Sequence, residues 1–246
     1  MPVPNPSPLL GIVDSGTSSV TRTVAARGFR PGPNGVEYGD ASPDTIGHAS
    51  ETLRLVHAAA PHAGLAMAQV FFESMTATPD AVAAAIDWLA GLGAAIINLS
   101  LGTTAGSTAL RDSSLRAIRA GCILVASVPA RGPLVFPAAY DGVLRATGDV
   151  RCAAGHLSHI RTERVDFGAC PQADDDDNRP TAAGGASIAA ARVSAALAAL
   201  LDAGVARSEV VATLAARCSI KGPQIGPFDS APRTVQRGPE STRGSR

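Results

Sequence analysis

The sequence lacks an excess of charge of either sign. Lys and Arg together number 21, as do Asp and Glu, so the formal net charge is zero. A balanced charge gives no long-range attraction to nucleic acid or to an anionic membrane, and we expect neither as a partner. Lysine is nearly absent, since Lys221 is the only one. We attribute this to the Ala- and Arg-rich composition of the chain rather than to a function.

The sequence also lacks a targeting signal. Residues 1–8 alternate with proline and contain no basic stretch followed by an apolar run, so we expect no secretory signal. The longest apolar stretch, residues 186–201, contains Arg192 and is too short to cross a bilayer, which indicates a buried helix. We therefore expect a cytoplasmic protein. In that compartment we expect free thiols rather than disulfides for the four cysteines, which are Cys122, Cys152, Cys170 and Cys218.

What is present fits one enzyme-sized domain. A chain of 246 residues can bury a large core. We expect a flexible lead over residues 1–8, a folded domain over residues 9–218, and a disordered tail over residues 219–246, where Pro, Gly, Ser, Thr and Arg dominate.

Strands and helices are expected to alternate along the folded domain. Apolar runs predict strands at residues 9–13, 64–72, 94–99, 122–128, 143–146 and 164–167. Helical periodicity predicts helices at residues 80–92, 107–120, 186–202 and 208–217, the last with Ser208 as its N-cap. This alternation predicts a three-layer α/β fold, with a mostly parallel twisted sheet and helices on both faces.

Three short segments contain an acid, a base and a hydroxyl. They read Gly-Ile-Val-Asp-Ser-Gly around Asp14, Gly-His-Ala-Ser around His48 and Gly-Ala-Ser-Ile-Ala around Ser187. Acyl transfer through a serine needs these three groups, because an unassisted hydroxyl is a poor nucleophile near neutral pH. Taken singly, each residue has a structural alternative: a strand-end turn for Asp14, a helix cap or surface position for His48 and a helix N-cap for Ser187.

From about residue 9 to about residue 201 the chain resembles the subtilases, the subtilisin-like serine proteases. The order Asp, His, Ser is the one found in subtilisin. Residues 85–102, Ala-Ile-Asp-Trp-Leu-Ala-Gly-Leu-Gly-Ala-Ala-Ile-Ile-Asn-Leu-Ser-Leu-Gly, resemble the helix, strand and substrate-binding segment of that family. Residues 60–71 and 136–143 resemble two further family segments.

The resemblance assigns roles to these residues. It implies that Asp14 orients His48, and that His48 takes the proton of Ser187 during attack and returns it to the leaving amine. The backbone N–H of Ser187, at a helix N-terminus, would face the oxyanion.

The resemblance also assigns a substrate-binding edge. It implies that Ser100, Leu101 and Gly102 pair their backbone with an extended peptide, although a strand end with a glycine turn would have the same sequence. Residues 73–79 would form the other, shortened edge of a more open groove.

One departure from the family pattern concerns the oxyanion. Residues 127–132 read Ser-Val-Pro-Ala-Arg-Gly, which places Ala130 where subtilases carry an Asn whose amide stabilises the oxyanion. Loss of such a donor costs about 10²–10³ in turnover, which leaves a slow enzyme. Arg131 is an alternative donor in the same oxyanion region.

Further departures concern metals and processing. The chain runs from Gly47-His48 almost directly to residues 60–61, without the insertion that forms a calcium loop, so we expect no metal there and no cofactor. Residues 174–177 are four acids in a row, read as a solvated loop with a cation site as the alternative. Residues 1–8 leave no room for a propeptide, so we expect a short form without one.

Two functional hypotheses remain. The first is a serine endopeptidase with restricted specificity and low turnover, acting on a peptide or protein substrate such as a precursor peptide. The second is a catalytically impaired pseudoprotease that binds peptides or proteins. Retention of Asp14, His48 and Ser187 favours the first, and Ala130 favours the second.

Overall fold

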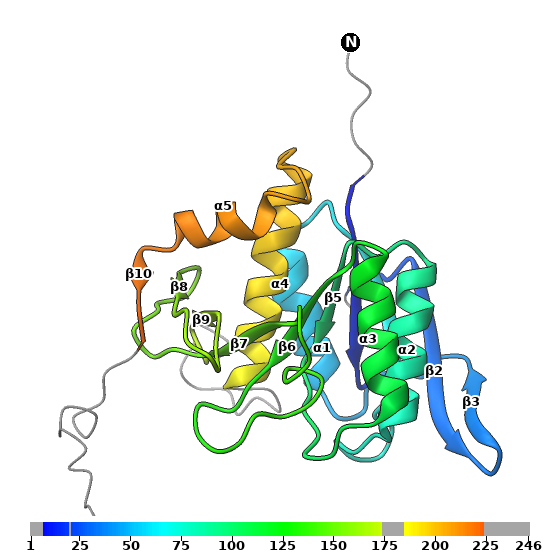
Figure 1. The fold of residues 1–246 in the computed structure, drawn as a ribbon. Coiled ribbons are helices and arrows are strands. Elements are labelled where there is room, and N and C mark those ends of the chain that lie inside the picture. The colour runs from blue at the N-terminus through cyan, green and yellow to red at the C-terminus, as the bar shows by residue number, and fades with distance from the viewer. Residues whose placement is uncertain (1–6, 20, 174–184, 224–246) are drawn as a thin grey trace, which may run out of the picture.

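The computed structural model describes residues 7–19, 21–173 and 185–223 (Figure 1). In this part of the chain the strands are β1 (Leu9–Asp14), β2 (Ala25–Gly32), β3 (Gly35–Gly39), β4 (Gly64–Gln69), β5 (Ile96–Leu99), β6 (Ile123–Ser127), β7 (Leu144–Gly148), β8 (Leu157–His159), β9 (Phe167–Ala169) and β10 (Ile220–Lys221). The helices are α1 (His48–Ala59), α2 (Pro79–Gly91), α3 (Thr108–Arg119), α4 (Ala186–Asp202) and α5 (Val210–Arg217).

The described strands form one sheet of ten in the order β10-β8-β9-β7-β6-β5-β1-β4-β2-β3. Two neighbouring pairs, β2 with β3 and β8 with β9, are antiparallel, and the others are parallel. β1 lies between β4 and β5, with Gly11 opposite both Ala66 and Ile97. The mostly parallel sheet predicted from the sequence is confirmed.

Helices cover both faces of the sheet, which makes the three layers (Figure 1). Successive side chains of a strand point to opposite faces, so β1 contributes to two cores. Leu10 and Ile12 pack toward α1, α4 and α5, whereas Val13 packs toward α2 and α3. Because β1 is buried on both faces, its last residue, Asp14, is delivered to the carboxyl edge of the sheet inside the protein.

Local signals set the ends of the helices on one face. The Thr78 side chain accepts a hydrogen bond from the backbone N–H of Ala81, and Pro79 occupies the first helical position of α2. The Ser107 side chain caps α3 in the same way through Leu110. These caps explain why both helices begin within one residue of their predicted starts.

Some elements differ from the prediction. The β2–β3 hairpin was not predicted, because Pro31 and several glycines interrupt its apolar pattern. The strand expected at residues 164–167 begins only at Phe167, since the Thr162 hydroxyl accepts the backbone N–H groups of Arg164 and Val165 and holds a turn there. Ser208 is not the cap of α5, whose N-cap residue is Glu209.

The part of the chain that the structure describes extends beyond residue 218, where the sequence predicts the tail to begin. Ile220 and Lys221 form β10, which pairs in parallel with β8. Residues 1–6, residues 174–177 and the tail from residue 224 lie outside the described residues, so the interpretations placed on them stay predictions. All four cysteines are buried and free. Among the described residues, no helix is both long and apolar enough to cross a bilayer.

Candidate active site

Asp14 is a fully buried carboxylate at the end of β1. Its Oδ1 accepts the backbone N–H of Ser15 at 2.7 Å, and its Oδ2 accepts the hydroxyl of Thr52 at 3.2 Å. The Nδ1 atom of His48 lies 2.7 Å from Oδ1. An ionised carboxylate only accepts hydrogen bonds, so Nδ1 carries the proton and Nε2 is left as the free base.

His48 is the first residue of α1 and is only 3% exposed. Gly47 precedes it with φ 88°, a left-handed conformation that glycine adopts without steric cost. Burial of the imidazole lowers its pKa, but the hydrogen bond and charge of Asp14 and the charge of Asp44 outweigh burial and hold the pKa above its usual value. Such a histidine is a stronger proton acceptor than an isolated one.

Ser187 is the second residue of α4, at the carboxyl edge of the sheet. The backbone N–H groups in the first turn of a helix have no partner within the helix, so that of Ser187 is available to an anion. The Ser187 hydroxyl donates to the carbonyl oxygen of Ser100 at 3.1 Å. Among the described residues, the Nε2 atom of His48 makes no hydrogen bond, so the nucleophile and the base are not joined in this state.

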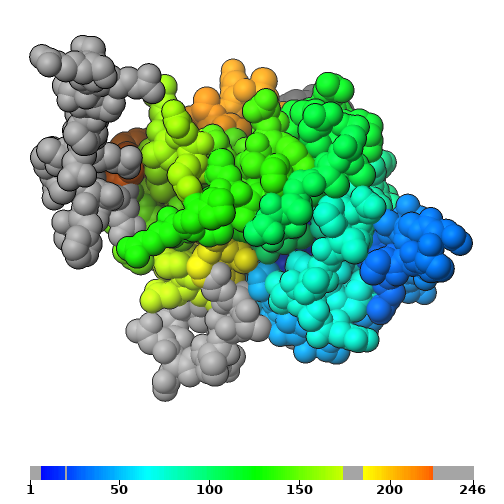
Figure 2. All heavy atoms as spheres, turned by 60° about the horizontal axis from the view of Figure 1, so that its bottom comes forward, coloured from blue at the N-terminus to red at the C-terminus, as the bar shows by residue number. Residues whose placement is uncertain are grey.

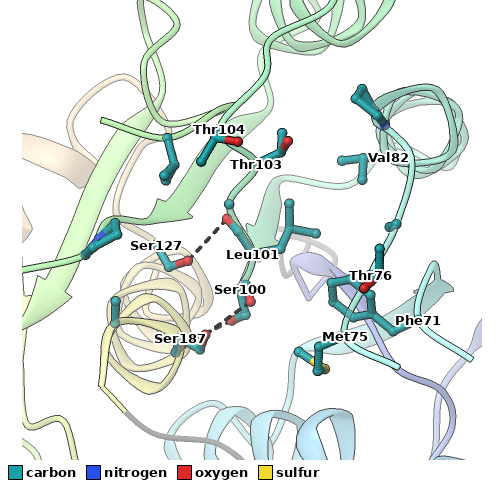
Figure 3. A pocket seen from close by; sticks show the side chains of 16 residues that line it. Phe71, Met75, Thr76, Val82, Ser100, Leu101, Thr103, Thr104, Ser127 and Ser187 are labelled. Carbon is teal, nitrogen blue, oxygen red and sulfur yellow. Dashed lines mark hydrogen bonds between the residues drawn. The ribbon is translucent and has the colours of Figure 1, made fainter. Parts of the chain in front are cut away.

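Ser187 opens onto a cavity of about 630 Å³ (Figure 3). Ser100, Leu101 and Gly102, which follow β5, line it together with Ser187. The opposite wall comes from the segment between β4 and α2, which includes Phe71. The parallel strands end at the bottom of Figure 1, and Figure 2 brings this edge forward.

The structure places the residues predicted for the oxyanion region in two different environments. Ser127 and Pro129 are among the residues that line the cavity, and the Ser127 hydroxyl donates to the carbonyl oxygen of Leu101 at 3.2 Å. Ala130 and Arg131 follow on an exposed turn outside the described lining. Of the three residues predicted for the oxyanion region, Ser187 is among the described residues that line the cavity, whereas Ala130 and Arg131 are not.

Several polar residues that hold the site were not singled out from the sequence. Asn98 is fully buried on β5; its Nδ2 donates to the Ser100 hydroxyl at 2.8 Å, and its Oδ1 accepts the Ser194 hydroxyl at 3.0 Å. The Ser100 hydroxyl in turn donates to the carbonyl oxygen of Ser187 at 3.0 Å. This Ser194–Asn98–Ser100 chain of hydrogen bonds joins α4 to the segment that follows β5. Its sequence signal was an asparagine inside an otherwise apolar strand.

Thr52 was also missed, although its spacing pointed to it. It lies four residues after His48 on α1, and positions i and i+4 of a helix share one face. In the described parts of the chain, no three His, Cys, Asp or Glu side chains gather in a group that could hold a metal ion.

A sequence model described as the subtilase family matches residues 38–214. The chain belongs to the subtilase family. The match includes His48 and Ser187 but begins after Asp14, so the place of Asp14 rests on the geometry above.

Individual subtilases and solved structures are similar as well. Subtilisin DY of Bacillus licheniformis is 28% identical over 150 residues, which cover 55% of this chain and 54% of the relative. This subtilase thus spans about half the length of that relative. The prenylagaramide maturation protease PagA superposes with a TM-score of 0.58 at 19% identity, covering 83% of this chain and 78% of PagA. The nisin leader peptidase NisP from Lactococcus lactis gives 0.58 at 18% identity, covering 84% and 81%. These two structures show the shared fold.

Proposed function

We propose that this subtilase is a serine endopeptidase that uses Asp14, His48 and Ser187 to cleave a peptide bond. The observation that carries the proposal is the buried contact of 2.7 Å between the imidazole of His48 and the carboxylate of Asp14. A buried pair of this kind at the carboxyl edge of a sheet, next to the helix that bears Ser187, is the arrangement that activates a serine.

The first chemical step is acylation. The Ser187 hydroxyl breaks its hydrogen bond to the Ser100 carbonyl and forms one to Nε2 of His48. As Oγ forms a bond to the scissile carbonyl carbon, the hydroxyl proton passes to Nε2. The imidazolium formed is stabilised by the Asp14 carboxylate, and it returns the proton to the nitrogen of the leaving amine as the C–N bond breaks. Water then attacks the acyl-enzyme by the same route and releases the second product.

The tetrahedral intermediate places a negative charge on the former carbonyl oxygen. In our proposal the N–H of Ser187 and the positive end of the α4 dipole stabilise it. Ala130 contributes no donor, so turnover is expected to be about 10²–10³ below that of a site with the amide.

The substrate we propose is an extended segment of a precursor peptide. The backbone of residues 100–102 would pair with it, and the cavity beside them would receive its side chains. Low turnover suits a protease that cuts one bond in one precursor. The names of PagA and NisP, a maturation protease and a leader peptidase, support this choice.

The location we propose is the cytoplasm. The four free, buried thiols support it.

A second candidate is a pseudoprotease that binds peptides through the same groove. Two observations favour it: the methyl group at Ala130, and the Ser187 hydroxyl held by Ser100 rather than by His48.

Peptide hydrolysis separates the two. A pool of synthetic precursor-like peptides is incubated with the wild type and with Ser187→Ala, and the products are identified by mass spectrometry. The protease is expected to cut few sites that share flanking residues, and Ser187→Ala none. Binding of peptides without new termini, equal in the two proteins, would establish the pseudoprotease instead.

A further inference from the structure

A second carboxylate, Asp44, binds the backbone on both sides of His48. It lies in the loop before α1. Its Oδ1 accepts the N–H groups of Ile46 at 3.0 Å and Gly47 at 2.8 Å, just before the histidine. Its Oδ2 accepts the N–H of Ser50 at 2.7 Å and the hydroxyl of the same residue at 2.8 Å, just after it. One side chain thus accepts hydrogen bonds from residues on both sides of His48 in the sequence.

Asp44 is also connected to the residue that follows Asp14. The Ser15 hydroxyl donates to Oδ1 of Asp44 at 2.9 Å and accepts the N–H of Ala49 at 2.9 Å. The N–H of Ser15 donates to Asp14 itself at 2.7 Å. The end of β1 and the start of α1 are therefore joined through Ser15 and Asp44, independently of the Asp14–His48 contact.

Asp44 takes the place of the N-cap side chain that α1 lacks. The N-cap residue of α1 is Gly47, which has no side chain to accept the first N–H groups of the helix. From outside the helix, Oδ2 of Asp44 accepts the N–H of Ser50 in the first turn, and Oδ1 accepts the N–H groups of Ile46 and Gly47 just before it. The carboxylate also places a negative charge at the positive end of the α1 dipole. An asparagine would supply one acceptor oxygen and no charge.

We propose that Asp44 is a positioning residue for the Asp14–His48 pair, because it fixes the start of α1 so that the imidazole faces the Asp14 carboxylate. Its contribution to turnover rests on the proposed protease function. Its effect on the imidazole does not, because that effect is a property of the folded chain.

The charges around the site agree with this assignment. Burial raises the pKa of Asp44, but the hydrogen bonds from Ser50, Gly47 and Ser15 outweigh burial and hold the pKa below its usual value, so the group is ionised at neutral pH. Among the described residues, Asp14 on β1 and Asp44 in the loop are the charged groups that raise the pKa of His48 against its burial. Removing the Asp44 charge therefore lowers that pKa.

The test is an NMR titration of the His48 ring in Asp44→Asn, with the signal assigned by its loss in His48→Ala. The matched control is Glu51→Gln, which removes another carboxylate from the first turn of α1, where Glu51 pairs with Arg54. We expect the pKa of His48 to fall in Asp44→Asn and to stay unchanged in Glu51→Gln. Equal values in the wild type and a folded Asp44→Asn would overturn the proposal.

Kinetics adds a readout that loss of stability alone would not produce. In Asp44→Asn we expect kcat to fall about 10-fold with little change in KM, and the rise of kcat with pH to move to lower pH, because misplaced catalytic groups cost turnover rather than binding.

A second variant keeps the proposal testable if Asp44→Asn does not fold. Asp44→Glu keeps the charge but lengthens the side chain, so kcat should fall while the pKa of His48 stays raised. Full activity in Asp44→Glu would contradict the positioning role. A wild type that cleaves no peptide would defeat the proposed function alone, since the titration still shows whether Asp44 acts on the His48 imidazole.

Discussion

Ser187 and Ser100 hold each other by two hydrogen bonds. The Ser187 hydroxyl donates to the carbonyl oxygen of Ser100 at 3.1 Å, and the Ser100 hydroxyl donates to the carbonyl oxygen of Ser187 at 3.0 Å. The pair ties the start of α4 to the residue that follows β5. It keeps the proposed nucleophile beside the backbone that a peptide would use, before any substrate is present.

The first prediction concerns this pair. Ser100→Ala removes the bond to Ser187 and leaves Nδ2 of Asn98 without its acceptor. We expect kcat to fall about 10-fold and the free energy of unfolding to fall by about 1–2 kcal/mol. Peptide hydrolysis and urea denaturation measure the two effects.

Ser114→Ala is the matched control for Ser100→Ala. It also removes a buried hydroxyl, one that donates to the carbonyl oxygen of Leu110 inside α3 at 2.7 Å. We expect its kcat to equal that of the wild type. An equal loss of kcat in both variants would mean that the Ser100–Ser187 pair has no special role.

The second prediction concerns Gly102. A Cβ added to Gly102 would lie 2.5 Å from Cγ2 of Val135, a buried side chain of the cavity wall. Gly102→Ala should therefore displace the proposed substrate edge and lower kcat/KM about 10-fold, because overpacking of this kind costs about 1–3 kcal/mol.

The partner variant makes this second prediction specific. In Gly102→Ala/Val135→Ala the contact with Cγ2 is removed and the nearest atom of residue 135 becomes its Cβ at 3.0 Å, so we expect kcat/KM to recover part of the loss. The four proteins of the cycle, assayed on one peptide, give the coupling directly. Additive losses would show that Gly102 is required for a reason other than its contact with Val135.

Much of the fold could be predicted because each strand or helix is specified by its own stretch of sequence. The apolar run before Asp14 and the alternation around α2, β5 and α3 follow from local pattern and caps. The contacts that assemble the site could not be predicted in the same way. Asn98 meets Ser194, 96 positions along the chain, through sheet register and helix packing that neither segment encodes alone.

The third prediction concerns the missing amide. Ala130 follows Pro129 on an exposed turn just outside the residues that line the cavity, and its side chain carries no donor. An asparagine at this position has a longer side chain, whose amide we expect to reach the cavity. Ala130→Asn should raise kcat about 10-fold or more with little change in KM, because an oxyanion donor acts in the transition state. Ala130→Asp has the same shape without the donor and should give no gain. A rise in both variants, or in neither, would count against an oxyanion deficit at this position.

The fourth prediction concerns stability away from the site. Asp149 is 1% exposed. Its Oδ2 accepts hydrogen bonds from Nη2 of Arg151 at 2.7 Å and from the Ser158 hydroxyl at 2.6 Å. Burial raises its pKa, but these bonds outweigh burial and hold the pKa below its usual value. Asp149→Asn should lower the free energy of unfolding by about 1–3 kcal/mol at pH 7.

The pH dependence of this loss follows from the sign of the shift. A carboxyl with a lowered pKa stabilises the fold fully above the pKa of the unfolded chain, about 3.9, and this contribution disappears as the pH falls through the folded value. The difference between the wild type and Asp149→Asn, measured by urea denaturation, should therefore shrink below pH ~4. A difference that stays constant down to the acid limit of folding would contradict this assignment.

The central claim is that Ser187 is a nucleophile activated by His48 and Asp14. Covalent labelling with a fluorophosphonate, read by mass spectrometry of the intact protein and of its peptides, tests it most directly. The account requires one adduct, located on Ser187, in the wild type and none in Ser187→Ala or His48→Ala. A folded wild type that stays unlabelled, or an adduct that persists in Ser187→Ala, would contradict it.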